Sequence, residues 1–425
     1  MRRTASRAAA PARTGAGGRV AAVDTLRGFA LLGILIVNIT YMASTHQGSG
    51  AADPAFDGPV DHAVRAVVAA LFEAKFFLLF SFLFGYSFTL QLGSARRAGT
   101  RFRPRFLRRL AGLFALGALH AVLLFPGDIL TTYAVLGLVL LAVHRIRLRT
   151  ALRLAAALLA ATAAAYALLA AALWRAGGGG VDTAAAEAGA ARAAEALRGD
   201  AASVVAAHLE QLPDVAFLLV FFQAPAALAM FLLGLVAGRL RLLDDPRRHE
   251  RALRRLLLAG GTLGVAGGLV YAHAGATRPG SAYHVLALGV DVLTAPLLAG
   301  AWGAAVVLAL RSRRLGRLTG ALAPPGRTAL TNYLAQSLVG ALLFTGYGAG
   351  LVNRVSPAGL AAIAVALFTA QALACRWWLR HHRYGPVEWA LRAWTVLGRP
   401  PWRAAPESGG SRAPRSAADK LSTKG

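Results

Sequence analysis

Charged residues are scarce in this 425-residue sequence, in which aspartate, glutamate, lysine and arginine together make up 15%. An ordinary soluble domain carries about a quarter. Hydrophobic residues make up 56%, and the mean hydropathy is +0.53. A water-soluble globule of this length cannot hide so much apolar surface. The shortage of charge therefore excludes a soluble protein and indicates an integral membrane protein.

Acidic residues are the scarcer kind of charge, with 19 of them against 46 lysines and arginines and a net charge of +27. In a soluble protein this excess would indicate nucleic-acid binding. Here the basic residues stand in short clusters between long apolar runs. That arrangement is typical of loops on the cytoplasmic side of a membrane. We therefore expect the lipid bilayer as a partner, and no nucleic acid.

Cysteine is nearly absent, and the single Cys375 cannot form an intramolecular disulfide. No group of cysteines and histidines has the spacing of metal ligands, so we expect no metal. The sequence also lacks a Walker loop, a dinucleotide fingerprint and a nucleophile elbow. These absences exclude the enzyme classes that such motifs mark.

Long apolar runs are plentiful, and ten of them approach or exceed the roughly 20 residues that a helix needs to cross the hydrocarbon core. They are residues 24–43, 66–92, 104–125, 128–144, 150–174, 213–238, 252–274, 283–310, 327–348 and 357–380. The third and fourth are separated only by a Pro-Gly turn, which predicts a tight helical hairpin. The predicted fold is an all-α integral membrane protein with about ten transmembrane helices.

Basic residues alternate between the connections of these spans. Six clusters hold 38 of the 46 lysines and arginines. These clusters lie at residues 2–19, 96–109, 145–153, 239–255, 311–327 and 376–424. An even number of crossings with this asymmetry predicts that both termini are cytoplasmic. We expect a multi-pass protein of the cell's inner (plasma) membrane.

The expected division of the chain follows from the same pattern. Residues 1–20 and 404–425 are rich in Ala, Arg, Ser, Gly and Pro and are predicted to be disordered. Residues 21–175 form a first five-helix half and residues 213–403 a second. The extracytoplasmic loop 176–212 lies between them, and we expect it to contain an interfacial helix.

Ionisable groups within membrane spans are costly, so each is a candidate functional residue. Asp24 and Arg27 are spaced i,i+3 and can pair on one helix face. They are either a helix cap with an interfacial arginine, or a cation that grips a phosphate-bearing donor. Asn38 lies about 16 Å deeper on the same helix. It serves either helix packing or the positioning of a substrate.

His120 is the only one of ten histidines expected well inside a span, at a depth similar to that of Asn38. A neutral imidazole can act as a general base, although a buried histidine can also be purely structural. Asp128 follows the Pro-Gly turn. A carboxylate there either caps the next helix or orients His120.

Five further polar residues are predicted to line a cavity or to bind a substrate. Glu73 and Lys75 are spaced i,i+2, so each needs a partner on another helix. Asp291 is a candidate counter-ion for Lys75. Asn332 and Gln336 are spaced i,i+4 on the ninth span and form a polar stripe that must face protein or a wet cavity.

Several blocks of residues resemble the YeiB-like membrane proteins. They are DTLRGFALLGI at 24–34, LFSFLFG at 79–85, LH at 119–120 and GDIL at 127–130. GRTALTNYL at 326–334 and GP with EW at 385–389 resemble the C-terminal domain of that family, a domain of unknown function with the number 418. The blocks extend over residues 20–400 and fall in the same order.

The opening block is also similar to two groups of transmembrane acyltransferases, the acyltransferase-3 enzymes and heparan-alpha-glucosaminide N-acetyltransferase. The resemblance implies transfer of an acyl group from cytoplasmic acyl-CoA, such as acetyl-CoA, to a glycan or lipid-linked acceptor across the membrane. It also implies that Arg27 orients the donor. Acyltransferase-3 enzymes have a histidine eleven residues after that arginine, where this sequence has Asn38. His120 is therefore the preferred base.

Two other classes of function agree with the same residues. In a transporter or flippase, Glu73, Lys75, His120 and Asp291 would form a coupling or proton relay without covalent chemistry. In a structural or assembly protein, the polar stripes would serve only helix packing.

Overall fold

The chain is all-helical in the part that the computed structural model describes, which is residues 15–48, 53, 55–177, 182–244, 246–312 and 314–403. The larger helices are α1 (Gly15–Ala43), α2 (Pro59–Leu71), α3 (Lys75–Arg97), α4 (Phe102–Leu123), α5 (Leu130–Val143), α6 (Leu148–Arg175), α7 (Thr183–Arg198), α8 (Ala201–Leu218), α9 (Ala224–Arg239), α11 (Gly261–Thr277), α12 (Ala282–Leu310), α15 (Ala329–Phe344), α16 (Pro357–His381) and α17 (Pro386–Val396). The shorter elements are the π-helical turns η1 (Leu219–Gln223) and η2 (Leu256–Gly260) and the helices α10 (Glu250–Arg255), α13 (Gly316–Gly320) and α14 (Ala323–Arg327).

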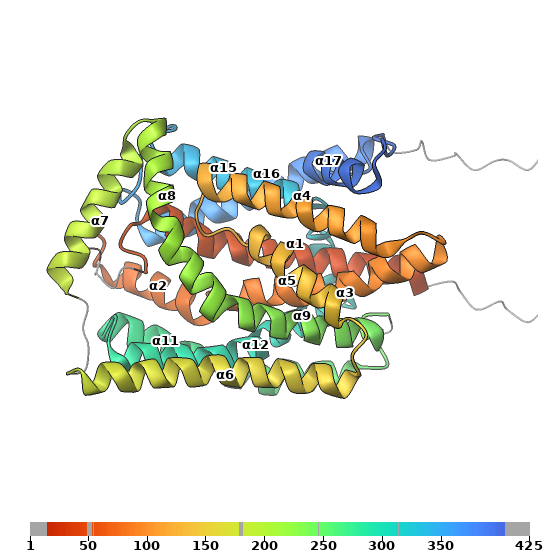
Figure 1. Cartoon of the computed structure of the whole chain (residues 1–425), viewed down its shortest axis with the longest axis horizontal. Coiled ribbons are helices and arrows are strands. Elements are labelled where there is room, and N and C mark those ends of the chain that lie inside the picture. Colours follow the sequence, from red (N-terminus) through yellow and green to blue (C-terminus); the bar gives the residue numbers. More distant parts are fainter. Residues whose placement is uncertain are drawn as a thin grey trace, which may run out of the picture.

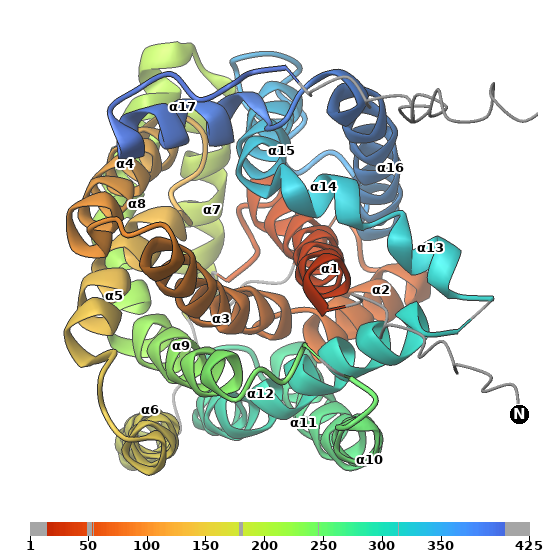
Figure 2. The same ribbon diagram turned by 90° about the vertical axis from the view of Figure 1, so that its right-hand side faces the viewer.

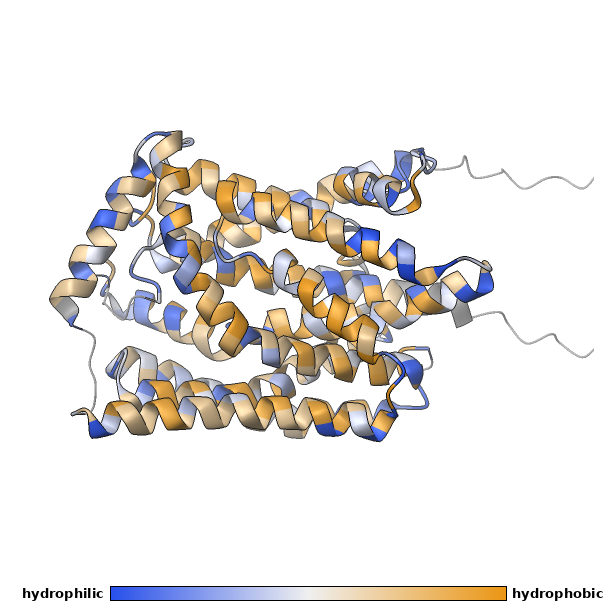
Figure 3. Ribbon diagram, viewed as in Figure 1, coloured by the Kyte–Doolittle hydropathy of each residue, from blue (hydrophilic) through white to orange (hydrophobic). Residues whose placement is uncertain are grey.

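The helices form one elongated bundle with α1 near its centre (Figures 1 and 2). Among the described residues, eight helical segments are long and apolar enough to cross a membrane. Two shorter apolar helices, α5 and α15, lie where the fourth and ninth spans were expected. Apolar residues dominate the middle of the bundle and hydrophilic ones gather at its two ends (Figure 3).

Large apolar side chains face outward from the bundle, among them Leu168 and Trp174, each 73% exposed. Such exposure is unfavourable in water and favourable against lipid tails. Together with the eight long apolar segments, it identifies a multi-pass membrane protein.

Glycines permit the closest helix contacts. A Cβ atom at Gly85 of α3 would overlap the backbone of Phe231 on α9, and one at Gly234 of α9 would overlap the backbone of Phe82 on α3. Lipid supplies no hydrophobic force between helices, so small residues that let backbones approach hold such pairs together. α3 and α9 thus form a tightly packed pair across the two halves of the chain.

The expected loop at 176–212 is largely helical in its described residues, 176–177 and 182–212. α7 is the helix that was expected within it. From Ala201, however, the chain runs through α8, η1 and α9 as one apolar helical segment to Arg239, with Pro213 inside α8. Asp200 starts this segment by accepting a hydrogen bond from Ser203 N at 2.8 Å. A proline within a helix is tolerated in membranes because neighbouring groups satisfy the freed carbonyls.

The second expected span is interrupted, although residues 66–92 contain no proline and their single glycine, Gly85, lies within α3. α2 ends at Leu71 and α3 begins at Lys75, and between them Ala74 has a left-handed φ of 62°. The carbonyls that the break frees are bonded by side chains. Lys75 Nζ lies 3.3 Å from Ala69 O, and Trp302 Nε1 lies 3.3 Å from Leu71 O.

The two chain ends differ from the expected disordered tails in one respect. Residues 1–14 and 404–425 lie outside the described residues, whereas α1 already begins at Gly15. The expected irregular segment 1–20 is therefore helical over its last six residues, because the apolar run that follows continues the same helix backward.

The C-terminal helix α17 positions the two helices that carry the candidate site. Glu388 Oε1 accepts hydrogen bonds from the backbone N–H groups of Leu330 and Thr331, at 2.7 and 3.0 Å, which caps α15. Trp394 Nε1 donates to the carbonyl of Arg108 on α4 at 2.8 Å. α17 therefore straps α4 and α15 together at one end of the bundle.

Candidate functional site

His120 lies between two oxygen atoms in the bundle interior. It is on α4, and its Nδ1 lies 3.0 Å from Asp128 Oδ1. Its Nε2 lies 2.8 Å from the hydroxyl oxygen of Ser337 on α15. The three residues are at most 2% exposed. The imidazole thus shares a hydrogen bond with a hydroxyl and lies against a carboxylate oxygen without hydrogen-bond geometry, and all three groups are shielded from solvent.

Asp128 has the capping role that was considered for it, and its second carboxylate oxygen lies beside His120. Its Oδ2 accepts hydrogen bonds from the backbone N–H and the hydroxyl of Thr131, at 2.7 and 2.9 Å, which caps α5. Its Oδ1 faces His120. Gly117 of α4 makes room for this turn, because a Cβ there would lie 2.5 Å from Asp128 Oδ2. The Pro-Gly turn between α4 and α5 therefore reverses the chain, so that the Asp128 carboxylate lies beside His120.

A small cavity adjoins Ser337. Its volume of about 10 Å³ is enough for one water molecule. The polar lining residues are Asn38 of α1 and Tyr333, Gln336 and Ser337 of α15, and the remaining walls are apolar. The Asn38 amide has no hydrogen-bond partner among the described residues. Asn38 and His120 thus reach the same region, since Ser337 touches both the cavity and the imidazole.

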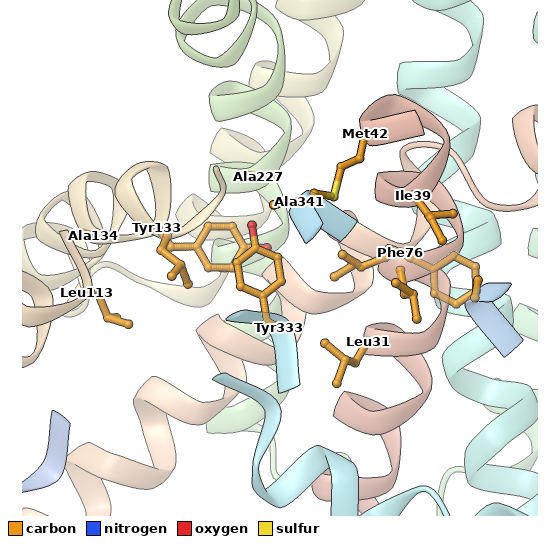
Figure 4. Packing of buried hydrophobic residues seen from close by; sticks show 14 of the residues in the cluster. Leu31, Ile39, Met42, Phe76, Leu113, Tyr133, Ala134, Ala227, Tyr333 and Ala341 are labelled. Atoms are coloured by element: carbon orange, nitrogen blue, oxygen red, sulfur yellow. The ribbon is translucent and has the colours of Figure 1, made fainter. Parts of the chain in front are cut away.

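The walls of this cavity belong to the main hydrophobic cluster of the bundle. Met42 and Ile39 of α1 and Tyr333 of α15 are members of it, together with Tyr133 and Phe76 (Figure 4). The Tyr333 ring lies 5.0 Å from the His120 ring. The apolar surroundings shield Asp128, His120 and Ser337 from bulk solvent.

Arg27 and Arg109 lie toward the end of the bundle where α1 begins. Arg27 Nη1 pairs with Asp24 Oδ1 at 3.2 Å, and its Nη2 donates to Ser87 Oγ at 2.5 Å. Arg109 Nε is buried and has no hydrogen-bond partner among the described residues. Arg27 precedes Asn38, and Arg109 precedes His120, by eleven residues, which is about 16 Å along a helix. Each arginine therefore lies about three helical turns before the interior polar residue on its own helix.

Glu73, Lys75 and Asp291 form a second cluster that does not include His120. The expected ion pair is present, with Lys75 Nζ 2.7 Å from Asp291 Oδ1. Tyr271 donates to Glu73 Oε2 at 2.8 Å, and Gln47 donates to Glu73 Oε1 at 3.0 Å. The cluster surrounds the break between α2 and α3. Each charged group has a partner on another helix, as the i,i+2 spacing required.

The polar stripe of α15 divides between packing and the cavity. Asn332 Nδ2 donates to Pro325 O, Thr328 Oγ1 and Cys375 Sγ at 3.0–3.2 Å, and the side chain does not line the cavity. Gln336 lines the cavity and also bonds Gln371 of α16 at 2.8 Å. Asn332 thus joins α14, α15 and α16, whereas Gln336 contributes to the site.

A larger cavity of about 660 Å³ lies at the basic end of the bundle. Five arginines line it, namely Arg96, Arg97, Arg145, Arg239 and Arg241. None of its lining residues belongs to α1 or α4. Arg239 donates to the carbonyls of His144 and Ile146, which holds it in place. No group of three or more His, Cys, Asp or Glu side chains that could hold a metal ion occurs in the described ranges.

Two residues near His120 escaped the sequence interpretation. A single serine within an apolar span gives no sign of a functional role. The only feature that distinguished Ser337 was its i,i+4 spacing from Tyr333. His208 was expected in a loop, but it lies on α8, is 3% exposed and contacts Val122 O through Nδ1 at 3.0 Å. His120 is therefore not the only buried histidine. The helical continuation before residue 213 is the reason that His208 was missed.

Comparison with known proteins identifies the family. Residues 237–398 match the family described as "Protein of unknown function (DUF418)". The chain is 31% identical to "Uncharacterized protein YxaH" of Bacillus subtilis (strain 168) over 401 residues, which cover 90% of this chain and 96% of that protein. It is 27% identical over 393 residues to an "Uncharacterized 39.9 kDa protein in amylase 3'region" of Bacillus acidopullulyticus, covering 89% and 94% of the two chains.

A shorter match completes the comparison. Over 85 residues, or 20% of this chain and 22% of the relative, it is 40% identical to "Uncharacterized protein YeiB" of Escherichia coli (strain K12). The resemblance that the sequence blocks carried is thus confirmed. The chain belongs to the DUF418 family of YeiB-like proteins.

Proposed function

We propose that this protein is a membrane acyltransferase, which moves an acyl group from cytoplasmic acyl-CoA, with acetyl-CoA the simplest donor, to a glycan or lipid-linked acceptor. The observation that carries this proposal is the position of His120 between Asp128 and Ser337, next to a cavity lined by Asn38. A base, an orienting carboxylate, a hydroxyl and an unpaired amide are the groups that acyl transfer uses.

Each residue has a role that follows from its contacts. The Asp128 carboxylate, 3.0 Å from Nδ1, stabilises the imidazolium that forms, and Nε2, which is hydrogen-bonded to Ser337, is the base. The Asn38 amide donates to the oxyanion that forms when the carbonyl is attacked. A hydrogen bond of this kind is strong in a site that excludes water, because no solvent competes for the charge.

The donor is held by Arg27 and Arg109, with Asp24 fixing the Arg27 side chain. A CoA donor carries its phosphates at one end and its thioester at the other, joined by an extended pantetheine arm. Guanidinium groups at one end of α1 and α4, about 16 Å from Asn38 and His120, match that layout. The buried Nε of Arg109 offers a free donor to a phosphate oxygen.

Acyl-CoA binding to the purified protein tests this assignment. Arg27→Gln and Arg109→Gln are each expected to weaken acetyl-CoA binding about tenfold or more in isothermal titration calorimetry, because each removes charge-assisted hydrogen bonds to phosphate. Arg96→Gln, which alters the separate 660 Å³ cavity, is the matched control and is expected to bind normally. If both test variants bound acetyl-CoA normally and the control bound it weakly, the donor site would be the 660 Å³ cavity instead. If the wild-type protein did not bind acetyl-CoA, acyl-CoA would be refuted as the donor class.

We also infer ten crossings of the plasma membrane, five in residues 21–175 and five in residues 213–403, with the basic end of the bundle in the cytoplasm. The eight long segments together with α5 and α15 supply the crossings. The positive-inside rule supplies the orientation. In a Cys375→Ser background, a membrane-impermeant maleimide is expected to label Glu187→Cys from outside intact cells, while Arg251→Cys reacts only after lysis. Labelling of both positions from the same side would contradict this topology.

A transporter or flippase is the second candidate, and the broken helix at Ala74 favours it. Membrane carriers bind substrates where helices are interrupted near charged groups. The interruption here lies beside Glu73 and the pair of Lys75 with Asp291. Such a protein would need no acyl donor, which separates the two functions by experiment.

A further inference from the structure

We propose that Ser337 is the nucleophile of the site and carries the acyl group as a serine ester between donor and acceptor. This proposal rests on the proposed function for the identity of the donor. With a serine ester as intermediate, the acyl transfer takes place in two displacement steps instead of one. His120 then acts on Ser337 first and on the acceptor afterwards. Ser337 lies on α15, far along the chain from His120 and Asp128 on α4 and the turn that follows it.

The order of contacts is that of an activated nucleophile, its base and the group that orients the base. Ser337 Oγ lies 2.8 Å from His120 Nε2, and His120 Nδ1 lies 3.0 Å from Asp128 Oδ1. In the tautomer with its proton on Nδ1, the imidazole presents an unprotonated Nε2 to the serine hydroxyl. Asp128 is itself held by two hydrogen bonds from Thr131, so its carboxylate stays beside the imidazole.

The hydrogen bonding of Ser337 differs from that of the other buried serines in the described part of the chain, Ser81 and Ser87. A serine within a helix ordinarily donates to the carbonyl four residues before it. Ser81 donates to Phe77 O at 2.8 Å, and Ser87 donates to Leu83 O at 2.5 Å. The Ser337 hydroxyl is instead hydrogen-bonded to His120 Nε2, and the imidazole tautomer determines which atom donates. When the imidazole carries its proton on Nδ1, the Ser337 hydroxyl donates to Nε2 rather than to a backbone carbonyl of α15.

Of the three residues Asp128, His120 and Ser337, it is Ser337 that borders the cavity. Asn38 borders the same cavity from α1, with its amide free among the described residues. A carbonyl carbon entering between α1 and α15 would meet the serine oxygen on one side and an amide donor on another. Apart from Asn38 and Gln336, the other lining residues are apolar or aromatic. The Tyr333 hydroxyl is the one other hydroxyl among the residues that line the cavity.

The two steps balance as follows. Ser337 Oγ attacks the thioester carbonyl and forms a C–O bond, and its proton passes to His120 Nε2. The C–S bond breaks, and the same proton goes to sulfur, which releases free CoA and leaves an acyl ester on Ser337. His120 then takes the proton of an acceptor hydroxyl, whose oxygen attacks the ester. The Ser337 ester C–O bond breaks, and Oγ regains a proton from His120.

A fluorophosphonate probe tests the nucleophile without any acyl donor, because it reacts with activated serine hydroxyls. The full-length protein in detergent is treated with the probe, digested and mapped by mass spectrometry. We expect an adduct on Ser337 that is lost in Ser337→Ala and in His120→Gln. Ser81→Ala is the matched control, a buried serine with no histidine contact, and is expected to keep the adduct. Absence of a His120-dependent adduct on Ser337 would overturn the assignment.

Acetyl-CoA without acceptor supplies the second readout. We expect one equivalent of CoA to be released per chain and a hydroxylamine-sensitive acetyl ester on Ser337, with acyl transfer lowered about 10³-fold or more in Ser337→Ala. Ser337→Cys in a Cys375→Ser background keeps a nucleophile of similar size and is expected to trap the acetyl group as a thioester. Acyl transfer that persists in Ser337→Ala would overturn the nucleophile and leave the acyltransferase standing. A His120-dependent probe adduct without any turnover of acyl-CoA would refute the donor and leave the nucleophile standing.

Discussion

Replacing His120 with glutamine is expected to lower acyl transfer by about 10⁴-fold, since it removes the base from every proton transfer in the reaction. The glutamine amide has donors and acceptors that can still reach Asp128 and Ser337, so the polar groups in the interior stay paired. The measurement is release of CoA from acetyl-CoA in the presence of membrane lipids or glycans as acceptors. Size-exclusion chromatography in detergent reports whether the variant keeps its fold.

The position of Asp128 and a matched control sharpen this result. Asp128→Asn is expected to lower the rate about 10²- to 10⁴-fold, because an amide cannot stabilise the imidazolium that forms when His120 accepts a proton. His208→Gln alters another buried histidine, which contacts only a backbone carbonyl, and is expected to retain the wild-type rate. A folded His120→Gln protein with the wild-type rate would remove His120 from the mechanism.

Breaking the ion pair between Lys75 and Asp291 is expected to lower the free energy of unfolding by about 3–5 kcal/mol. The Lys75 side chain is fully buried and that of Asp291 is 5% exposed, so removal of either partner leaves an uncompensated charge in a medium of low dielectric. Lys75→Met and Asp291→Leu serve as the single variants. Denaturation in detergent, followed by circular dichroism, measures the change.

The double variant Lys75→Met with Asp291→Leu distinguishes the pair from its separate charges. It leaves no charge behind, so we expect it to be more stable than either single variant. Glu250→Gln, which breaks exposed pairs with Arg254 and Arg311, is the control and is expected to have little effect. Additive losses in the double variant would show that the two charges are not coupled.

The same double variant separates the two candidate functions. In an acyltransferase, the cluster around Lys75 stabilises the break between α2 and α3 and does not touch the reacting groups, so the folded double variant retains acyl transfer. In a transporter, these charges carry the coupling. The double variant would then lose proton movement across liposomes, as measured with an enclosed pH-sensitive dye, which wild type would show without acyl-CoA.

Local sequence features predicted the parts of the molecule that depend on solvent and on neighbouring residues. A deficit of charge with long apolar runs makes lipid the solvent, and the hydrogen-bonding of the backbone then leaves helices as the way to cross it. The pairing of Asp24 with Arg27 and the return of Asp128 onto His120 follow from spacings of a few residues. Periodicity and turn chemistry act over such distances.

The remaining parts depended on which helices meet. Ser337 meets His120 where α15 packs beside α4, with α17 bonded to both helices. Asn332 serves packing because it bonds Pro325, Thr328 and Cys375 on its own and neighbouring helices. The break at Ala74 has no glycine or proline to announce it, and groups from distant helices satisfy the carbonyls that it frees. The continuation of α8 before Pro213 likewise depends on surrounding helices. Contacts between residues hundreds of positions apart leave no local pattern, so the tertiary structure alone decided them.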